Sequence, residues 1–269
     1  MPELPEVETI LRGIKPALLG KTLQKVIIRR PNLRWEIPIS DLHKLAGHKI
    51  IGIERRAKYL LIKINKGTLI IHLGMSGCLR LYEELPSAQK HDHVDFIFNS
   101  INLRYTDPRR FGAILWTDLS PENHSLLKNL GPEPLDKKFN AEYLMRHTHN
   151  KKAAIKNIIM DSQIVVGVGN IYATEALFIA HIHPNMPSNQ LILSQAKMLC
   201  RSIKAVLRKA IIAGGTTLKD FMSTAGKPGY FRHRLLVYGR ENQPCVRCGN
   251  TLKKLIIGQR STVYCSHCQ

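Results

Sequence analysis

The sequence has few acidic residues for its length. Asp and Glu together number 20 against 40 Lys and Arg, so the 269-residue chain carries a formal net charge of +20. The like charges in such an excess repel one another and destabilise the folded protein, so we expect the charge to have a function. Binding a polyanion is the leading use, because each neutralised phosphate releases condensed counterions. Nucleic acid is therefore the expected partner, and a ribosomal role or an anionic membrane surface stays open on charge alone.

Long apolar runs and secretion signals are also missing. No stretch of 18 apolar residues occurs, so we expect no membrane-spanning helix. The opening MPELPEVE is acidic and interrupted by proline, unlike a signal peptide. The six cysteines form no disulfide framework, since four lie in two C-terminal CxxC pairs and Cys78 and Cys200 are expected to be packed thiols. A reducing cytoplasm fits this cysteine usage best.

Three compositional blocks follow one another along the chain. Residues 1–130 open with a helical pattern over residues 7–19, for which Gly20 is a plausible stop. Short β-rich runs then predict a sandwich or flattened barrel: QKVIIRR, HKIIGIE, KYLLIKI, TLIIHLG, HVDFIFN and AILWT. Beyond the linker LGPEPLD at 130–136, residues from about 137 to 222 are predicted to be helical, within a domain of residues 131–225. Residues 226–269 hold a loop and a zinc ribbon. The expected fold class is α+β and multidomain.

The C-terminal ribbon carries the strongest motif. Cys245 and Cys248 form one CxxC pair, and Cys265 and Cys268 form a second after sixteen intervening residues. Two such pairs bring four thiolates into a tetrahedron around Zn²⁺. Four sulfur ligands leave no open coordination position, so we expect one structural zinc ion. The hairpin between the pairs is too small to fold without its metal.

A second informative stretch is VVGVGNIYATEALF. Gly167 and Gly169 allow successive backbone amides to converge, and Asn170 can cap the helix that follows. The amide groups and the helix dipole suit one phosphate group. A glycine turn between two packed helices is the alternative, and the upstream Lys151, Lys152 and Lys156 favour the phosphate.

The amino terminus gives a weaker signal by itself. Pro2 follows Met1, and a small second residue favours removal of the methionine, which leaves a secondary amine beside the Glu3 carboxylate. Taken alone, Pro-Glu at a terminus is typical of a frayed or helix-starting segment.

Nine motifs in order change that interpretation: PELPEVET, RRAKYL, HLGMSG, KHDHVD, TDPRRFG, VVGVGNIYATEALF, GGTTLKDF, KPGYF and the CxxC pairs. Together they resemble the bacterial formamidopyrimidine-DNA glycosylase family, also called 8-oxoguanine DNA glycosylase, over the whole chain. The resemblance implies an N-terminal β-sandwich, a helix-two-turn-helix domain and a zinc finger. It also implies a monomeric enzyme of base excision repair. This enzyme would remove 8-oxoguanine and formamidopyrimidines from double-stranded DNA and then cleave the strand by β,δ-elimination.

The resemblance assigns roles to individual residues. Pro2 matches the Schiff-base nucleophile, and Glu3 the proton donor of the glycosylase step. Lys58 matches the proton donor for β-elimination, and Arg260 the one for δ-elimination. The expected DNA contacts are His72, His91, Arg109, Lys151, Lys156 and Asn170. The side chains expected to fill the gap left by the extruded nucleotide are Met75, Arg109 and Phe111.

Physical chemistry agrees with these roles. An enzyme cannot attack the sugar of a stacked nucleotide until the nucleotide rotates out, so apolar wedges such as Met75 and Phe111 must replace it. Without the resemblance, the sequence favours ordinary core residues for Met75 and Phe111 and a simple phosphate contact for Arg109. A terminal amine has a pKa of about 7.7–8.0 against about 10.4 for lysine, so a larger share of it is neutral and nucleophilic near pH 7.

Two rival functions remain at this stage. The related endonuclease VIII acts on oxidised pyrimidines, but the PELPEV opening and the KPGYF loop favour the purine enzyme. A non-catalytic zinc-ribbon protein that binds DNA or RNA would also explain the charge, the helix-turn element and the ribbon. Trapping with borohydride separates this second rival from an enzyme, since a pure binding protein forms no covalent complex.

Overall fold

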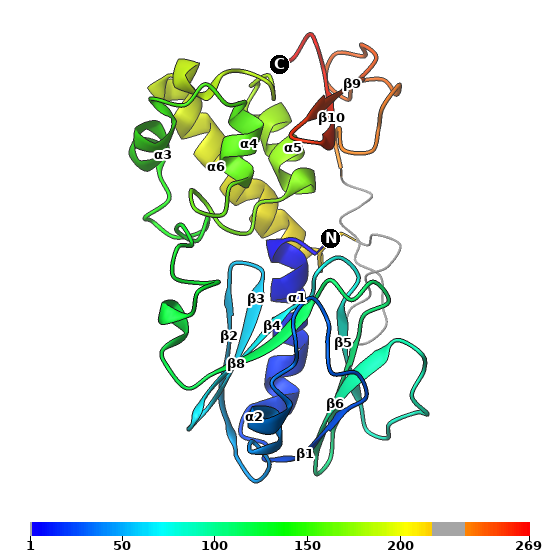
Figure 1. Cartoon of the computed structure of the whole chain (residues 1–269). Helices are drawn as coiled ribbons and strands as arrows, with labels where there is room; N and C mark the ends of the chain where they lie inside the picture. The colour runs from blue at the N-terminus through cyan, green and yellow to red at the C-terminus, as the bar shows by residue number, and fades with distance from the viewer. Residues whose placement is uncertain (1, 217–234) are drawn as a thin grey trace. The chain divides into compact units, whose positions relative to one another are not determined.

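The structure is a computed structural model that describes residues 2–216 and 235–269. It divides into two compact units, one made of residues 1–128 with 213–230 and the other of residues 129–212 with 231–269. Buried hydrophobic side chains cluster within each unit. Figure 1 labels the helices and strands of the two units. The expected loop over residues 226–234 lies outside the described residues, as does most of GGTTLKDF.

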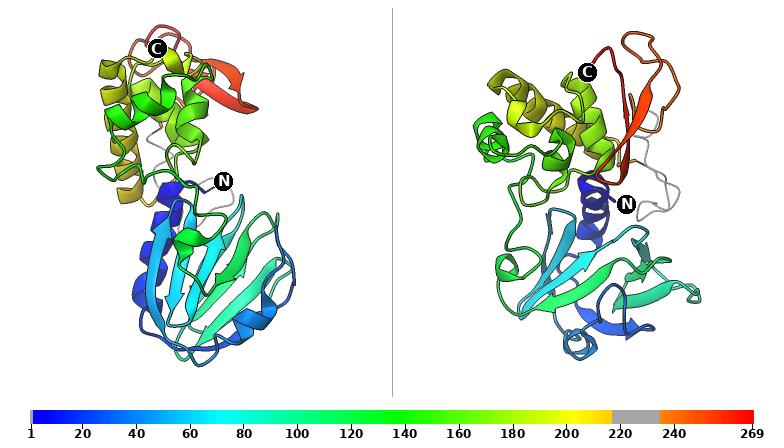
Figure 2. Two further views of the ribbon diagram at one scale, coloured as in Figure 1. Left: turned by 60° about the vertical axis from the view of Figure 1, so that its left-hand side comes forward. Right: turned by 45° about the horizontal axis from the view of Figure 1, so that its top comes forward.

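The first unit is a sandwich of two antiparallel four-stranded sheets, seen as separate layers in Figure 2. The first sheet has the order β1-β6-β7-β5, with β1 at Leu23–Ile28, β5 at Cys78–Tyr82, β6 at Asp92–Phe98 and β7 at Asn102–Thr106. The second has the order β2-β3-β4-β8, with β2 at Ile50–Arg56, β3 at Tyr59–Ile64, β4 at Gly67–His72 and β8 at Ala113–Thr117. Because the strands form two separate sheets rather than one closed sheet, the fold is a sandwich and not a barrel, and both sheets contribute side chains to one core.

Helix α1 (Leu4–Leu18) completes this core. Its buried residues Val7, Ile10, Ile14 and Leu18 repeat at helical spacing, and the helix packs against β2 and β3. Glu3 and Glu6 form a capping box at its first turn. Gly20 has a positive φ of 78°, which suits the expected stop after the helix. The short helix α2 (Ile39–His43) and the turn η1 (Pro121–Asn123) belong to the same unit.

Two strands were not predicted from the sequence. Both β5 and β7 carry an arginine, Arg80 and Arg104, which interrupts the apolar pattern that marks a buried strand. In the fold Arg104 is almost fully buried and pairs with carboxylates of the neighbouring strand. A charged side chain can be buried only with a partner of opposite charge, and this partner lies on another strand. The sequence of one segment therefore does not indicate that it forms a buried strand.

In its described residues, the second unit consists of four α-helices and a hairpin. The helices are α3 (Ala141–Thr148), α4 (Ile155–Met160), α5 (Asn170–Ile179) and α6 (Leu193–Ile212), and the short 3₁₀ helix η2 (Ser188–Gln190) lies between α5 and α6. Helix α5 is buried on nearly all sides and contacts α4, α6 and the hairpin strand β10 (Arg260–Tyr264), which pairs with β9 (Lys253–Ile257). Within the described part of the chain, no helix combines the length and apolar character needed to cross a membrane. The expected α+β multidomain fold is confirmed.

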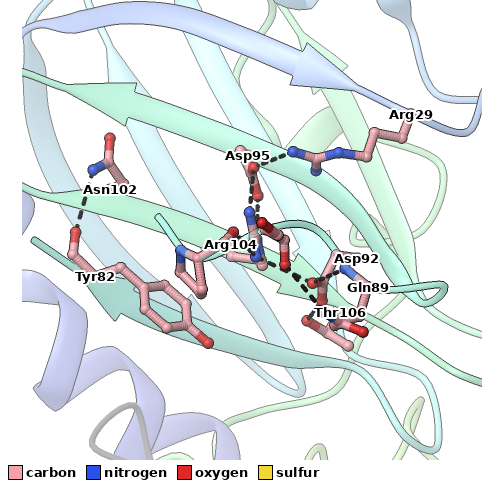
Figure 3. A network of polar contacts seen from close by, with 10 residues as sticks. Arg29, Tyr82, Gln89, Asp92, Asp95, Asn102, Arg104 and Thr106 are labelled. Atoms are coloured by element: carbon pink, nitrogen blue, oxygen red, sulfur yellow. Dashed lines mark hydrogen bonds and ion pairs between the residues drawn. The ribbon is translucent and has the colours of Figure 1, made fainter. Parts of the chain in front are cut away.

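A buried ion-pair network joins three strands on the outer face of the first sheet (Figure 3). Asp95 is fully buried and accepts hydrogen bonds from Nε and Nη2 of Arg104, at 2.8 and 2.9 Å, on the paired strand β7. Arg29, which follows β1, also donates to Asp95, and Asp92 accepts from Arg104 Nη1 at 3.1 Å. Burial opposes the ionised form of Asp95, but the two arginines more than offset it, so its pKa lies below the ordinary value.

We therefore predict that Asp95→Asn lowers the free energy of unfolding by about 3 kcal/mol at pH 7, because it leaves Arg104 buried without its anion. A carboxyl whose folded pKa is lowered stabilises the protein above its unfolded pKa, and the contribution is lost as pH falls through the folded value. The difference between wild type and variant should be constant above about pH 5 and shrink in stronger acid. Urea unfolding can be followed by tryptophan fluorescence, since Trp35 and Trp116 both belong to the first unit.

The matched control is Asp41→Asn, which removes the exposed ion pair with Lys44 and should cost under about 0.5 kcal/mol. An equally small loss for Asp95→Asn would show that the buried network contributes nothing.

Candidate nucleic-acid interface and metal centre

The first turn of α1 fixes the amino-terminal segment. Pro2 and Glu3 are buried, with Glu3 only 2% exposed, and the backbone N–H of Glu3 donates to Oε2 of Glu6 at 2.8 Å. The other oxygen of Glu6 accepts from both the backbone N–H and the hydroxyl of Thr216, each at 2.9 Å. Glu6 therefore ties the start of the helix to residue 216 of the same unit. Sequence reasoning overlooked Glu6, although its spacing of three from Glu3 is the capping-box signature.

Lys58 lies in the tight turn between β2 and β3. The turn depends on Ala57, whose φ of 54° is unusual for a residue other than glycine. Arg55 stabilises it by donating from Nη1 to the carbonyl of Ala57 at 3.1 Å, while Arg55 Nε pairs with Glu8 of α1 at 2.8 Å. The half-buried ion pair thus links the lysine turn to the helix that starts next to Pro2.

His72 is held in a neutral state at the end of β4. Its ring packs against Tyr59 of β3 with centroids 4.8 Å apart. Burial, together with the positive charges of Lys58 and Arg34, lowers the pKa of His72 to about 4. The backbone N–H of Gly74 donates to Nδ1 at 3.1 Å, so the neutral ring carries its proton on Nε2. His72 is therefore a hydrogen-bond donor without a charge near neutral pH.

The expected gap-filling residues stand on two loops of this unit. Met75 is 37% exposed and Phe111 is 47% exposed, which excludes the alternative that they are core residues. Arg109 is exposed, and its guanidinium lies 5.2 Å from the ring of Phe111. His91 is half-buried. It lies next to the same loop, since its backbone carbonyl accepts a hydrogen bond from the N–H of Asp107 at 3.0 Å.

In the second unit Lys151 is exposed, but Lys156 is not. Lys156 is 0% exposed, and its Nζ donates to Asn170 Oδ1 and to Thr262 Oγ1, both at 2.5 Å. Asn170 Nδ2 in turn donates to the carbonyl of Ser261 at 3.1 Å. The ammonium group of Lys156 is thus enclosed by protein groups in this structure, whereas the sequence predicted that it contacts DNA. The lysine instead joins the start of α5 to strand β10.

The loop before α5 has the backbone expected of a phosphate site. Gly167 has a φ of 78°, a region that favours glycine, and Gly169 is the N-cap residue of α5. Asn170 then opens the helix, whose dipole places partial positive charge at this end and favours an anion.

The four cysteines come together at the end of the same unit. Their Sγ atoms all lie within 4.8 Å of one another, with Cys245–Cys268 at 3.9 Å and Cys248–Cys265 at 3.5 Å. A tetrahedron with Zn–S bonds of about 2.3 Å has edges of about 3.8 Å, so the four sulfurs fit one zinc ion. Cys78 and Cys200 are buried elsewhere, as expected. The cysteines thus form a site for one structural zinc.

Arg260 lies at the tip of the ribbon. The residues before it, Gly258 and Gln259, have φ angles of 53° and 61°, which is typical of a two-residue hairpin turn. The Arg260 side chain is exposed. Arg247 is another basic residue of the ribbon, but its guanidinium lies 4.5 Å from the ring of Phe178 and donates to the carbonyl of that residue. That arginine attaches the ribbon to α5.

A second attachment was not predicted from the sequence. Glu175 of α5 is 2% exposed, and its carboxylate accepts from the backbone N–H groups of Leu236, Val237 and Tyr238 at 2.8–2.9 Å. Burial raises the pKa of Glu175 even though the three N–H groups lower it. No local pattern signals this role, because the partners lie about sixty residues away.

Three family models match this chain in order. They are the formamidopyrimidine-DNA glycosylase N-terminal domain over residues 1–114, the H2TH domain of the same enzymes over residues 130–222, and the zinc finger found in FPG and IleRS over residues 242–269. The fold and the site thus define a zinc-finger DNA glycosylase with a helix-two-turn-helix domain.

Full-length relatives narrow the class. A formamidopyrimidine-DNA glycosylase of Hydrogenovibrio crunogenus is 54% identical over 100% of this chain and 96% of its own. The crystal structure of MutM (Fpg) from Thermus thermophilus has a TM-score of 0.90 at 36% identity, covering 100% of this chain and 98% of that one. Fpg from Lactococcus lactis, solved with DNA containing N7-benzyl-Fapy-dG, has a TM-score of 0.91 at 35% identity, covering 100% and 99%. The chain belongs to the formamidopyrimidine-DNA glycosylase family.

We predict that Cys265→Ser removes the zinc and unfolds the ribbon, because metal binding and local folding are coupled in so small a hairpin. Cys265 is fully buried in the core that the ribbon shares with Phe178. Metal analysis of purified protein should fall from one zinc per chain to less than about a tenth of that.

Cys200→Ser is the control. Burial raises the pKa of Cys200 to about 12, so this cysteine stays a neutral thiol that binds no metal, and the variant should keep its zinc. Full zinc content in Cys265→Ser would contradict the assignment of the four ligands.

Proposed function

We propose that this chain removes oxidised purines, such as 8-oxoguanine and formamidopyrimidines, from double-stranded DNA and then cleaves the strand at the vacated site. It is a DNA glycosylase of base excision repair with an apurinic-site lyase activity, as its family implies. The observation that carries the catalytic proposal is the fixed start of α1, where Glu6 holds the backbone of Glu3 next to Pro2. A nucleophile that must meet one sugar carbon gains rate from such fixation.

Base removal follows from the chemistry of Pro2. Once Met1 has been removed, the nitrogen of Pro2 is a free secondary amine whose lone pair attacks the sugar C1′. The base leaves with the electrons of the glycosidic bond and takes up the proton that the Pro2 nitrogen loses. Glu3 donates a proton to the sugar ring oxygen, so the bond between C1′ and that oxygen breaks and the ring opens. The product is an iminium ion between Pro2 and C1′. It cannot lose an N–H proton, so it stays positive and withdraws electrons.

Strand cleavage depends on the positive iminium ion, which withdraws electrons from the neighbouring sugar carbons. Loss of a C2′ proton places its electron pair in a conjugated system, and the C3′–O bond breaks to release the 3′ phosphate. A second elimination releases the 5′ phosphate, and water hydrolyses the remaining iminium to free Pro2. We assign the proton for the first leaving group to Lys58, which α1 positions through Arg55 and Glu8. We assign the proton for the second leaving group to Arg260.

Both neutral and charged hydrogen-bond donors contact the DNA phosphates in this proposal. We propose that His72 donates from Nε2 without a charge, as its lowered pKa requires. His91, Arg109, Lys151 and Asn170 provide the other contacts. Lys156 acts through Asn170 and strand β10, and the zinc keeps that strand folded.

Met75, Arg109 and Phe111 fill the space that the extruded nucleotide leaves. Met75 and Phe111 are apolar wedges on the surface. When they pack against bases, their apolar surface is removed from water, which stabilises the complex. Arg109 can donate to the orphaned partner base from a position beside Phe111.

We further propose the domain boundaries 1–130, 131–225 and 226–269, together with a place in the bacterial cytoplasm on the nucleoid. The two sheets of the sandwich enclose one hydrophobic core, and the helices of the second unit pack around the buried helix α5. These two separate centres of packing support an N-terminal domain and a helical domain.

For Pro2, we predict that a retained Met1 or a fused N-terminal tag abolishes base removal and strand cleavage but leaves DNA binding intact. An amide nitrogen has its lone pair delocalised and cannot attack C1′. Pro2→Gly keeps a terminal amine that is primary and less well oriented, so slow residual activity is expected. Each variant is incubated with 8-oxoguanine duplex and borohydride, and the trapped adduct is digested and located by mass spectrometry.

An adduct at Lys58, or full activity with Met1 retained, would contradict this mechanism. A parallel assay on thymine glycol duplex separates the purine enzyme from endonuclease VIII.

For Lys156, we predict that Lys156→Met weakens binding to lesion duplex by about tenfold without changing the slope of log K against log salt. The side chain neutralises no phosphate itself, because it is enclosed by Asn170 and Thr262. Lys151→Ala is the matched comparison, since that exposed lysine should lower the magnitude of the slope by about 0.9. Zinc content shows whether the ribbon remains folded.

A slope change in Lys156→Met equal to that of Lys151→Ala would mean that Lys156 reaches a phosphate after all.

A further inference from the structure

The two loops that carry the exposed wedges share one buried carboxylate. Residues 73–77 carry Met75, residues 107–112 carry Arg109 and Phe111, and Asp107 at the start of the second loop is 0% exposed. Its carboxylate accepts hydrogen bonds from both loops and from the core. One buried anion therefore organises residues from three segments of the first unit.

One oxygen of Asp107 binds the two loops to each other. The hydroxyl of Ser76 donates to Asp107 Oδ1 at 2.6 Å, and Ser76 Oγ also accepts from the backbone N–H of Arg109 at 3.1 Å. The same N–H lies 3.3 Å from Asp107 Oδ1. Ser76 is 5% exposed, so water hardly competes for these bonds.

The other oxygen holds the far end of the second loop. The backbone N–H of Gly112 donates to Asp107 Oδ2 at 2.8 Å, and the hydroxyl of Tyr105 donates to it at 3.2 Å. Burial, and the charge of Asp107 next to it, raise the pKa of Tyr105 well above its ordinary value, so the phenol remains a donor. Each end of the loop thus donates an amide to the same carboxylate.

Backbone packing makes the arrangement rigid. A Cβ atom at Gly74 would lie 2.3 Å from the carbonyl carbon of Phe111, and Gly74 has a φ of 61°. Arg110, also in the left-handed region at 57°, donates its N–H to the carbonyl of Asp107 at 3.3 Å. The backbones of the two loops therefore touch directly, and neither can shift without moving the other.

We propose that Asp107 and Ser76 are positioning residues that lock the Met75 loop to the Arg109–Phe111 loop, so that the three side chains enter the duplex as one preformed wedge. This inference rests on the proposed gap-filling role. A wedge ordered before it meets DNA loses less conformational entropy when it displaces a base. Asp107 itself touches no DNA, because its carboxylate is enclosed and fully engaged with protein donors.

Two hydroxyl deletions test the lock. Ser76→Ala and Tyr105→Phe each remove one buried hydroxyl that donates to Asp107, but only Ser76 connects the two loops. We expect Ser76→Ala to slow excision of 8-oxoguanine under single-turnover conditions by about tenfold. Tyr105→Phe should slow it by no more than about twofold, because both cross-loop bonds of Ser76 remain.

A double-mutant cycle with Met75→Ala gives a readout that general destabilisation does not change. If Ser76 acts by placing Met75, the variant carrying both Ser76→Ala and Met75→Ala should excise no more slowly than Met75→Ala alone. Amide hydrogen exchange measures the lock without DNA, and it should be faster at Arg109 in Ser76→Ala than in Tyr105→Phe.

The outcomes separate this inference from the proposed function. Slow excision by Met75→Ala together with equal rates for Ser76→Ala and Tyr105→Phe would overturn the lock and leave the wedge. Rates that multiply in the double variant would also overturn it. Excision by Met75→Ala at the wild-type rate would overturn the gap-filling role, and the positioning role of Ser76 and Asp107 with it.

Discussion

Buried carboxylates that accept backbone N–H groups hold the functional segments of this protein in place. Glu6, Asp107 and Glu175 are each 2% exposed or less. Glu6 accepts from Glu3 and Thr216, Asp107 from Arg109 and Gly112, and Glu175 from three residues that precede the ribbon. Hydrogen bonds to a charged acceptor are short and strong, and breaking one leaves a costly buried anion. Such segments therefore keep one conformation without regular secondary structure.

This use of acidic side chains also shapes the surface. The chain has only 20 acidic residues, and Glu3, Glu6, Asp92, Asp95, Asp107 and Glu175 are buried. Few carboxylates are left on the outside to oppose 40 lysines and arginines. The outer face is therefore more basic than the net charge suggests, which favours steering toward a phosphate backbone. Not every basic residue faces outward, since Lys156 is enclosed and Arg247 stacks on Phe178.

The roles proposed for Pro2, Lys58 and His72 depend on the same kind of support from neighbours. Pro2 adjoins a capping box, Lys58 a turn held by Arg55, and His72 an amide that fixes its tautomer. In each case a hydrogen bond to or from a backbone group, rather than a contact with another catalytic side chain, sets the geometry. A nucleophilic amine, a proton donor and an uncharged imidazole donor all benefit from positions fixed in this way.

The sequence alone determined the features that local chemistry controls. The two CxxC pairs indicated zinc because tetrahedral ligation needs only four thiolates at that spacing, and apolar periodicity placed α1, α4, α6 and six of the strands. The family resemblance named Pro2, Glu3 and the wedge residues. Only the tertiary structure decided that Lys156 is enclosed, that Met75 and Phe111 are exposed, and that β5 and β7 are strands.

The physical reason is the distance along the chain between the partners. Arg104 is tolerated inside β7 because of Asp92 and Asp95, and Lys156 is buried because Thr262 lies 106 residues further on. The free energy of a buried charge depends on its partner, and the partner is fixed only when the chain has folded. Burial of a polar side chain is therefore a property of the fold, whereas the CxxC spacing and the capping box are properties of a few neighbouring residues.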